Sequence, residues 1–132
     1  MPKRKYFRRI YVDEITEAHD KLKAKYPSGS LPDWRNVWVQ VESVEGCEFS
    51  KQEKILALVE FDQRTCINTL DADNPIAALE VISWSDGYLA DFQQYEFAVP
   101  ESNKQMQKAL LRHFGLEGEV EPPCRVYVVR RQ

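Results

Sequence analysis

Three features are scarce or missing in this sequence of 132 residues, and each absence excludes a class of protein. No apolar run approaches the roughly 18 residues of a membrane-spanning helix, so we expect no membrane partner. The charged stretch 1–9 is not followed by the apolar segment of a secretory signal. The cysteines, Cys47, Cys66 and Cys124, are odd in number and widely spaced, which predicts reduced thiols in a cytoplasmic protein.

Glycine is scarce as well, and the metal-binding side chains are not grouped. The 5 glycines are scattered, so they cannot form the Gly-rich turns that bring phosphate groups close to the backbone. His19 and His113 stand alone on separate predicted helices, whereas zinc sites use short pairs of ligands. Asp71 and Asp73 resemble the start of a calcium loop, but the glycine and the distal glutamate are missing. We therefore expect no metal and no cofactor.

No arrangement of residues points to catalysis. Cys66 lies in a predicted polar loop, and as a nucleophile it would need a base such as His19 or His113 in contact with it. The favoured interpretation is a buried or idle loop cysteine. The 21 acidic residues offer many carboxylate pairs, and such abundance is typical of a solvated acidic surface. We expect no catalytic residues and a protein that is not an enzyme.

Charge is distributed unevenly along the chain, although the net charge is only −3. Residues 1–9 contain five basic residues and no acidic one, and residues 122–132 contain three arginines and no acidic one. The stretch 10–121 carries a formal charge of −11, and its densest acidic part is 44–101. Such an asymmetry bears on partners rather than on fold.

Three segments have helical signals. Residues 13–26 place apolar side chains on one face, with acids in the first turns and lysines in the last, as the helix dipole favours. Asn74-Pro75 predicts the start of a second helix, which we expect to end in a turn at 85–87. Ser102 and Gln105 have the spacing of a capping box for a third helix, which Gly115 ends.

Five segments favour strands: 5–12 at a sheet edge, 36–44, 54–62, 94–99 and 125–130. Two of them have alternatives. Residues 54–62 also fit a helix capped at Ser50, and the apolar spacing in 88–99 fits a helix as well as a strand. The stretches 63–74 and 116–123 are predicted to be loops.

The order of these elements predicts an α+β fold. We expect one domain over residues 1–132, with a mixed or antiparallel sheet of four to five strands and two to three helices packed on it. Nothing in the sequence resembles a linker that would divide it.

Aromatic residues within the acidic middle suggest a binding function. Trp38 lies opposite the valine face of its strand, so it is either an exposed interface anchor or covered by a second layer. We predict a non-catalytic protein-binding module, an acidic inhibitor or accessory protein for a basic or nucleic-acid-handling partner. The candidate contact residues are Trp38, Glu60, Asp62, Trp84, Asp86, Tyr88, Asp91 and Tyr95.

The alternative hypothesis is nucleic-acid binding through the two basic ends of the chain. If the first and last strands are neighbours, their basic side chains form one patch for phosphate groups. The candidate residues are Lys3, Lys5, Arg8, Arg9, Arg125, Arg130 and Arg131. An exposed edge strand, 5–12 or 125–130, also allows pairing with a second copy of the chain, so a homodimer is a further hypothesis.

Overall fold

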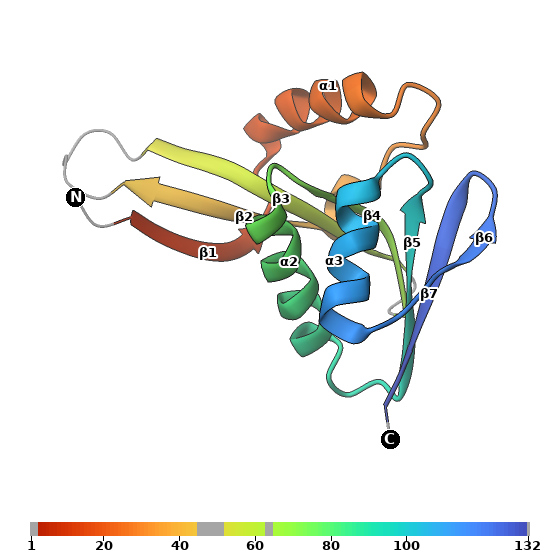
Figure 1. The fold of residues 1–132 in the computed structure, drawn as a ribbon. Coiled ribbons are helices and arrows are strands. Elements are labelled where there is room, and N and C mark those ends of the chain that lie inside the picture. Colours follow the sequence, from red (N-terminus) through yellow and green to blue (C-terminus); the bar gives the residue numbers. More distant parts are fainter. Residues whose placement is uncertain (1–2, 45–51, 63–64, 132) are drawn as a thin grey trace.

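A computed structural model describes residues 3–44, 52–62 and 65–131. These residues contain one mixed sheet with the strand order β1-β2-β3-β4-β5-β7-β6 (Figure 1). The strands are β1 (Lys3–Arg9), β2 (Val37–Val44), β3 (Gln52–Asp62), β4 (Cys66–Ala72), β5 (Gln94–Pro100), β6 (Glu119–Glu121) and β7 (Cys124–Arg130). The helices are α1 (Ile15–Lys25), α2 (Pro75–Tyr88) and α3 (Lys104–Phe114), and short 3-10 turns cover Val12–Glu14 and Trp34–Asn36.

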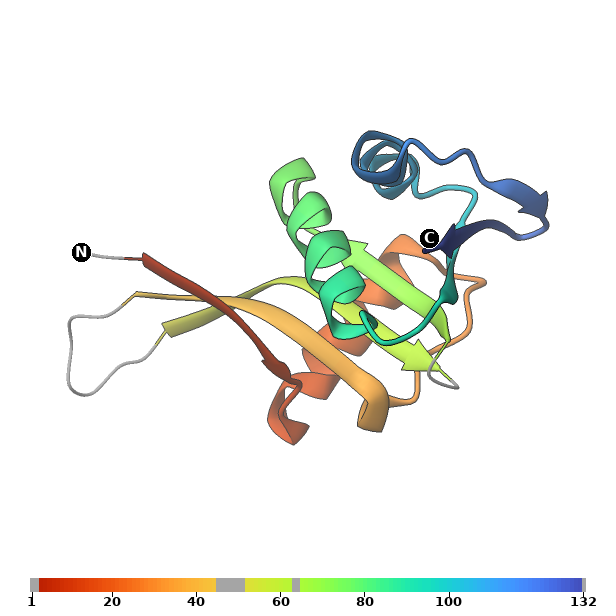
Figure 2. The same cartoon turned by 90° about the horizontal axis from the view of Figure 1, so that it is seen from below.

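The helices cover the sheet on both faces. Figures 1 and 2 show α1 on one face and α2 and α3 on the other. Val37, Val39 and Val41 of β2 are fully buried against α1 and β3, where they meet Leu22 and Leu58. On the other face, the larger part of the core joins α2 and α3 to β3, β4, β5 and β7, with Phe97 and Leu110 fully buried.

Only one neighbouring pair in the described sheet is parallel, that of β4 and β5. Parallel strands need a crossover connection, and α2 supplies it. The pairing joins Cys66 to Glu96 and Ile67 to Phe97, near the beginning of β4. The first turn of α3 lies at the other end of β4, where Gln105 donates to the Ala72 carbonyl at 3.1 Å.

The predicted sheet of four to five strands is wrong, because the described residues form seven. β4 lies in the stretch 63–74, predicted to be a loop. Its period-2 pattern is hidden because Leu70, Asp71 and Ala72 are buried in succession. β6 lies in the predicted loop 116–123, and its three residues are all exposed, so no apolar pattern marks it.

Other predictions for single elements are confirmed. Residues 54–62 and 94–99 are strands and not helices, and β1 is a sheet edge. β7 is not an edge, because β6 pairs with its outer side. Among the described residues, no helix is long and apolar enough to cross a membrane.

α2 begins as predicted and ends later than predicted. The Asn74 side chain accepts a hydrogen bond from the Ala77 amide at 2.8 Å, with Pro75 in the first turn. The predicted turn at 85–87 is the last part of the helix, because Ser85 donates to the Val81 carbonyl at 2.7 Å instead of breaking the ladder. The helix therefore carries Tyr88.

The guanidinium of Arg131 caps the C-terminal end of α2. It donates to the carbonyls of Asp86 at 2.9 Å, Leu89 at 3.0 Å and Phe92 at 2.9 Å. The last carbonyls of a helix have no partner within the helix, and a cation is favourable beside them. The C-terminal segment of the chain thus holds the last turn of α2 in place.

α3 has a different cap from the one predicted. Asn103, and not Ser102, accepts from the Met106 amide at 3.1 Å, and its amide group also donates to the Leu70 carbonyl at 3.3 Å. Asn103 is 7% exposed, whereas Ser102 is exposed. Gly115 ends the helix with a φ of 69°, as its left-handed cap position requires.

We expect Asn103→Ala to lower the free energy of unfolding by about 1–3 kcal/mol, because it removes a helix cap and a buried hydrogen bond. Urea denaturation measures this difference. The matched control, Ser102→Ala, should stay within about 0.5 kcal/mol of the parent protein. Equal losses for the two variants would contradict the assignment of the cap.

Candidate functional site

Five aromatic side chains meet where α2 crosses the first three strands. This aromatic cluster consists of Phe7 on β1, Trp38 on β2, Phe61 on β3, and Trp84 and Tyr88 on α2. Phe7 stacks on Trp84 with ring centroids 4.5 Å apart, and Phe61 stacks on Tyr88 at 4.4 Å. Trp84 and Tyr88 share one face of α2 because residues four apart are neighbours on a helix. Each such pair adds about 0.5–1.5 kcal/mol to the stabilisation from burial.

Beside this cluster, the surface is hollowed into a groove of about 380 Å³. The aromatic groove lies between the ends of β1 and β3, the start of β2 and the end of α2. Its lining residues are Arg9, Asn36, Trp38, Phe61, Tyr88, Leu89 and Phe92. Tyr88 is 48% exposed, which is high for an aromatic residue of a packed helix. The groove therefore presents aromatic faces to the surroundings.

Arg9 is the one charged residue among the lining residues of this groove. Its guanidinium lies 5.2 Å from the centroid of Trp38 and donates to the carbonyl of Arg35. A cation above an aromatic face is attracted by the negative face of the ring. Both contacts hold the charge at the rim of the groove.

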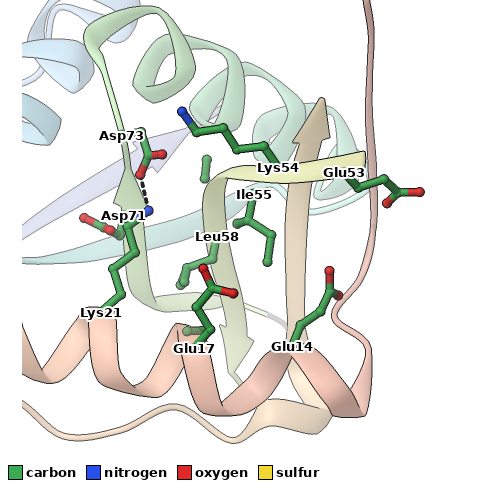
Figure 3. A pocket seen from close by; sticks show the side chains of 11 residues that line it. Glu14, Glu17, Lys21, Glu53, Lys54, Ile55, Leu58, Asp71 and Asp73 are labelled. Carbon is green, nitrogen blue, oxygen red and sulfur yellow. Dashed lines mark hydrogen bonds and ion pairs between the residues drawn. The ribbon is translucent and has the colours of Figure 1, made fainter. Parts of the chain in front are cut away.

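A second cavity, of about 250 Å³, lies between α1 and the strands β3 and β4. Two of its acidic side chains have lysine partners: Figure 3 shows Lys21 reaching Asp73, and Lys25 lies 2.9 Å from Asp71. Burial, together with the neighbouring Asp71, raises the pKa of Tyr26, which donates to that carboxylate at 3.3 Å. Among the described residues, no three histidine, cysteine or acidic side chains converge to hold a metal ion.

The aromatic residues predicted for a protein interface fall into two groups. Trp38, Trp84 and Tyr88 come together in the aromatic cluster, so α2 covers the face of β2 that carries Trp38. Tyr95 is instead 1% exposed and donates to Asp86 at 2.7 Å.

The acidic residues predicted for the same interface mostly have internal partners. Glu60 accepts from the Asp33 amide at 2.8 Å and from Thr69 at 2.9 Å. Asp62 accepts from the side chain of Asn68, and Asp86 forms an ion pair with Arg131 at 2.9 Å. Asp91 is exposed.

The basic strands are not neighbours, so the single basic patch required by the nucleic-acid hypothesis does not form. β1 lies at one edge of the sheet, and four strands separate it from β7. Lys3 begins β1. Most of the other basic side chains have acidic or amide partners, as in the pairs Lys5–Glu80 at 3.1 Å, Arg125–Glu101 at 2.9 Å and Arg130–Gln94 at 3.3 Å.

Arg8 has the largest number of charged partners in this set. It donates to Glu14 at 2.7 and 2.8 Å and to Glu53 at 2.8 and 3.1 Å, and it lies 3.8 Å from the ring centroid of Tyr11. These hydrogen bonds hold the pKa of each carboxyl group below its usual range, with a further contribution from Tyr6 at Glu53. Arg8 is therefore a structural residue.

Sequence reasoning missed part of the groove. Phe61, Phe92 and Asn36 were not candidates. Phe61 could have been found from the strand pattern, because it lies on the same face of its strand as Val59. The helical spacing of Trp84 and Tyr88 was not used, because a turn was expected at 85–87.

Comparisons with known proteins give a fold and no family. No protein-family model and no curated protein sequence matches the chain. Its structure is similar to that of a protein described as a "putative acetyltransferase" from Sphaerobacter thermophilus DSM 20745, with a TM-score of 0.59 and 12% identity over 99% of this chain and 96% of the other. It is also similar to PH1933 from Pyrococcus horikoshii OT3, with a TM-score of 0.55 and 11% identity over 98% of this chain and 99% of the other. At such low identity these similarities show the fold alone.

We expect Arg8→Gln to lower the free energy of unfolding at pH 7 by about 1–3 kcal/mol, because two carboxylates lose charged hydrogen bonds. Both carboxyl groups have lowered pKa values in the folded state, so this stabilisation is present above about pH 4.3 and is lost as the pH falls through the folded-state values. Urea denaturation between neutral and acidic pH should therefore show the two proteins converging in acid.

The control for this measurement is Arg130→Gln, since Arg130 contacts the uncharged side chain of Gln94. It should change stability by less than about 0.5 kcal/mol. A deficit of Arg8→Gln that persists undiminished into strong acid would contradict the ionic origin of the effect.

Proposed function

We propose that the protein is a non-catalytic binding protein that recognises another protein through the aromatic groove. The observation that carries this proposal is the groove itself, in which aromatic side chains and one arginine line a hollow of about 380 Å³ at the surface. Tyrosine, tryptophan and arginine are the residues that most often dominate the binding energy of protein interfaces.

The state of Cys66 does not favour nucleophilic catalysis by this thiol. Burial, together with nearby Glu96 and Asp62, raises the pKa of Cys66 to about 11, so its thiol is protonated at neutral pH. Its sulfur lies 2.9 Å from the side-chain oxygen of Asn68. A catalytic cysteine needs the opposite shift, toward the thiolate.

The Sphaerobacter protein raises the question of acetyl transfer. The usual acetyl donor is acetyl-CoA, whose coenzyme A part carries phosphate groups. Phosphate groups bind where backbone amides point outward at a helix N-terminus, commonly beside glycines. In this chain the helix after the parallel strand β4 begins at Asn74-Pro75. Pro75 has no amide hydrogen, the Asn74 side chain occupies the Ala77 amide, and the carboxylate of Asp73 is adjacent. These residues do not fit a bound phosphate group.

The carboxyl end of β4 is also occupied by α3. Asn103 donates to the Leu70 carbonyl at 3.3 Å, and Gln105 donates to the Ala72 carbonyl at 3.1 Å. Ligands of open α/β sheets commonly bind at the carboxyl ends of the strands. Here side chains of the protein itself take these backbone groups, which favours a function elsewhere on the surface.

We expect acetyl-CoA not to bind. Its addition up to roughly 1 mM should leave Tm unchanged, because a ligand that binds only the folded state stabilises it and raises Tm as the ligand concentration increases. A nucleoside bisphosphate serves as the control for binding of the phosphate groups alone. An increase in Tm that grows with acetyl-CoA concentration would contradict the non-catalytic proposal.

We expect affinity capture from a lysate of the source organism to yield one protein in stoichiometric amount, and Tyr88→Ala to weaken its binding by roughly 30-fold or more, as for an interface hot spot. Val120→Ala is the matched control, since Val120 is 54% exposed and lies on β6, at the opposite edge of the sheet from β1. Circular dichroism verifies that both variants fold. Equal capture by Tyr88→Ala and by the parent protein would contradict the proposal.

A further inference from the structure

The aromatic groove carries a positive charge, although the acidic composition of the chain suggests a negative binding surface. The groove has a single charged lining residue, Arg9, and no lining carboxylate. The acidic residues Glu60 and Asp86 are held by hydrogen bonds and ion pairs within the protein. Opposite charges favour association, so Arg9 favours an acidic group over a basic one within the groove.

Arg9 is positioned to receive such a group. A guanidinium has five N–H donors in one plane. Within the described part of the chain, the structure gives one hydrogen bond of Arg9, to the carbonyl of Arg35. The guanidinium also lies 5.2 Å from the centroid of the Trp38 ring, and this cation–π contact helps to hold it in place. A carboxylate can accept two parallel hydrogen bonds from a guanidinium held in this way.

The rest of the groove suits an aromatic ring. Tyr88 contacts Phe61, Trp84 and Trp38 with ring centroids 4.4, 5.3 and 5.6 Å apart, and it is still 48% exposed. An incoming ring can therefore pack against the exposed part of Tyr88. Phe92 and Leu89 add apolar surface, and Asn36 offers an amide at the edge. A volume of about 380 Å³ is near the lower end of the roughly 300–1,000 Å³ of ligand pockets. It has room for one ring and a short acidic group.

We propose that the groove binds a segment of the partner protein in which an aromatic side chain is followed by an acidic residue. The ring packs on Tyr88 and Phe61, and the carboxylate pairs with Arg9. This inference rests on the proposed function, because it names the chemistry of the partner that the groove recognises.

Two capped dipeptides test this directly, N-acetyl-Trp-Asp-amide and N-acetyl-Trp-Asn-amide, which differ in charge and hardly in shape. Each is titrated into the full-length protein labelled with ¹⁵N, and the amide shifts of Arg9, Asn36, Tyr88, Leu89 and Phe92 are followed. We expect the Asp peptide to shift these amides and to bind about 5-fold or more tightly than the Asn peptide. The preference should decrease with added salt, since exposed charges are screened.

Variants separate the two parts of the site. Arg9→Gln should bind both peptides equally, because the charge that distinguishes them is gone. Tyr88→Ala should weaken both peptides and keep the preference for Asp. Val120→Ala should bind like the parent protein. Arg9 is exposed, so its substitution should leave the fold intact, which the dispersion of the amide spectrum verifies.

The outcomes distinguish this inference from the proposed function. The inference would be overturned if roughly 10 mM peptide caused no shifts of the groove amides, because this concentration detects even very weak binding. Equal affinities in the parent protein, or a preference for Asp that persists in Arg9→Gln, would overturn it as well. Failure to capture a partner protein, with the peptide preference present, would overturn the proposed function and support the chemistry of the groove.

Discussion

The packing of α2 across β1, β2 and β3 is the contact on which both the core and the groove depend. Trp84 and Tyr88 are one helical turn apart, so both face the sheet. Trp84 stacks on Phe7 at the edge of the core, with ring centroids 4.5 Å apart, whereas Tyr88, in the last turn, is 48% exposed. The guanidinium of Arg131 donates to the carbonyl of Asp86 in that last turn and to the carbonyls of Leu89 and Phe92 just after it. A single helix thus packs one half-buried aromatic residue against the core and presents the next one at the surface.

The uneven charge of the chain is mainly a structural feature. Four strands separate the two basic strands, and their arginines pair locally: Arg8 with Glu14 and Glu53, and Arg125 with Glu101. Arg131, which follows β7, donates to carbonyls at the end of α2. Buried or half-buried charges have to be paired, so a strand rich in arginine attracts acidic neighbours. Arg9 differs because its described partners are a backbone carbonyl and an aromatic ring, which leaves its charge facing the groove.

Local pattern predicted most of the helices and strands, and tertiary contacts decided the rest. The strand β3 and the start of α2 followed from alternation and capping. β4 was missed because burial of Asp71 depends on Lys25, which is 46 residues away in the sequence. Of the site, Trp38 and Tyr88 were candidates, but Phe61 and Phe92 were not. The groove brings together the ends of four elements, and no local pattern reveals which ends meet.

Hydroxyl-radical footprinting of the protein, free and in complex with its captured partner, tests the central claim most directly, because it reports the exposure of each side chain without any substitution. The account predicts strong protection of Tyr88 and Phe92 in the complex, with unchanged oxidation of Val120 on β6 and Leu111 on α3. Unchanged oxidation of Tyr88, together with protection of Val120 or Leu111, would contradict it and place the contact surface elsewhere.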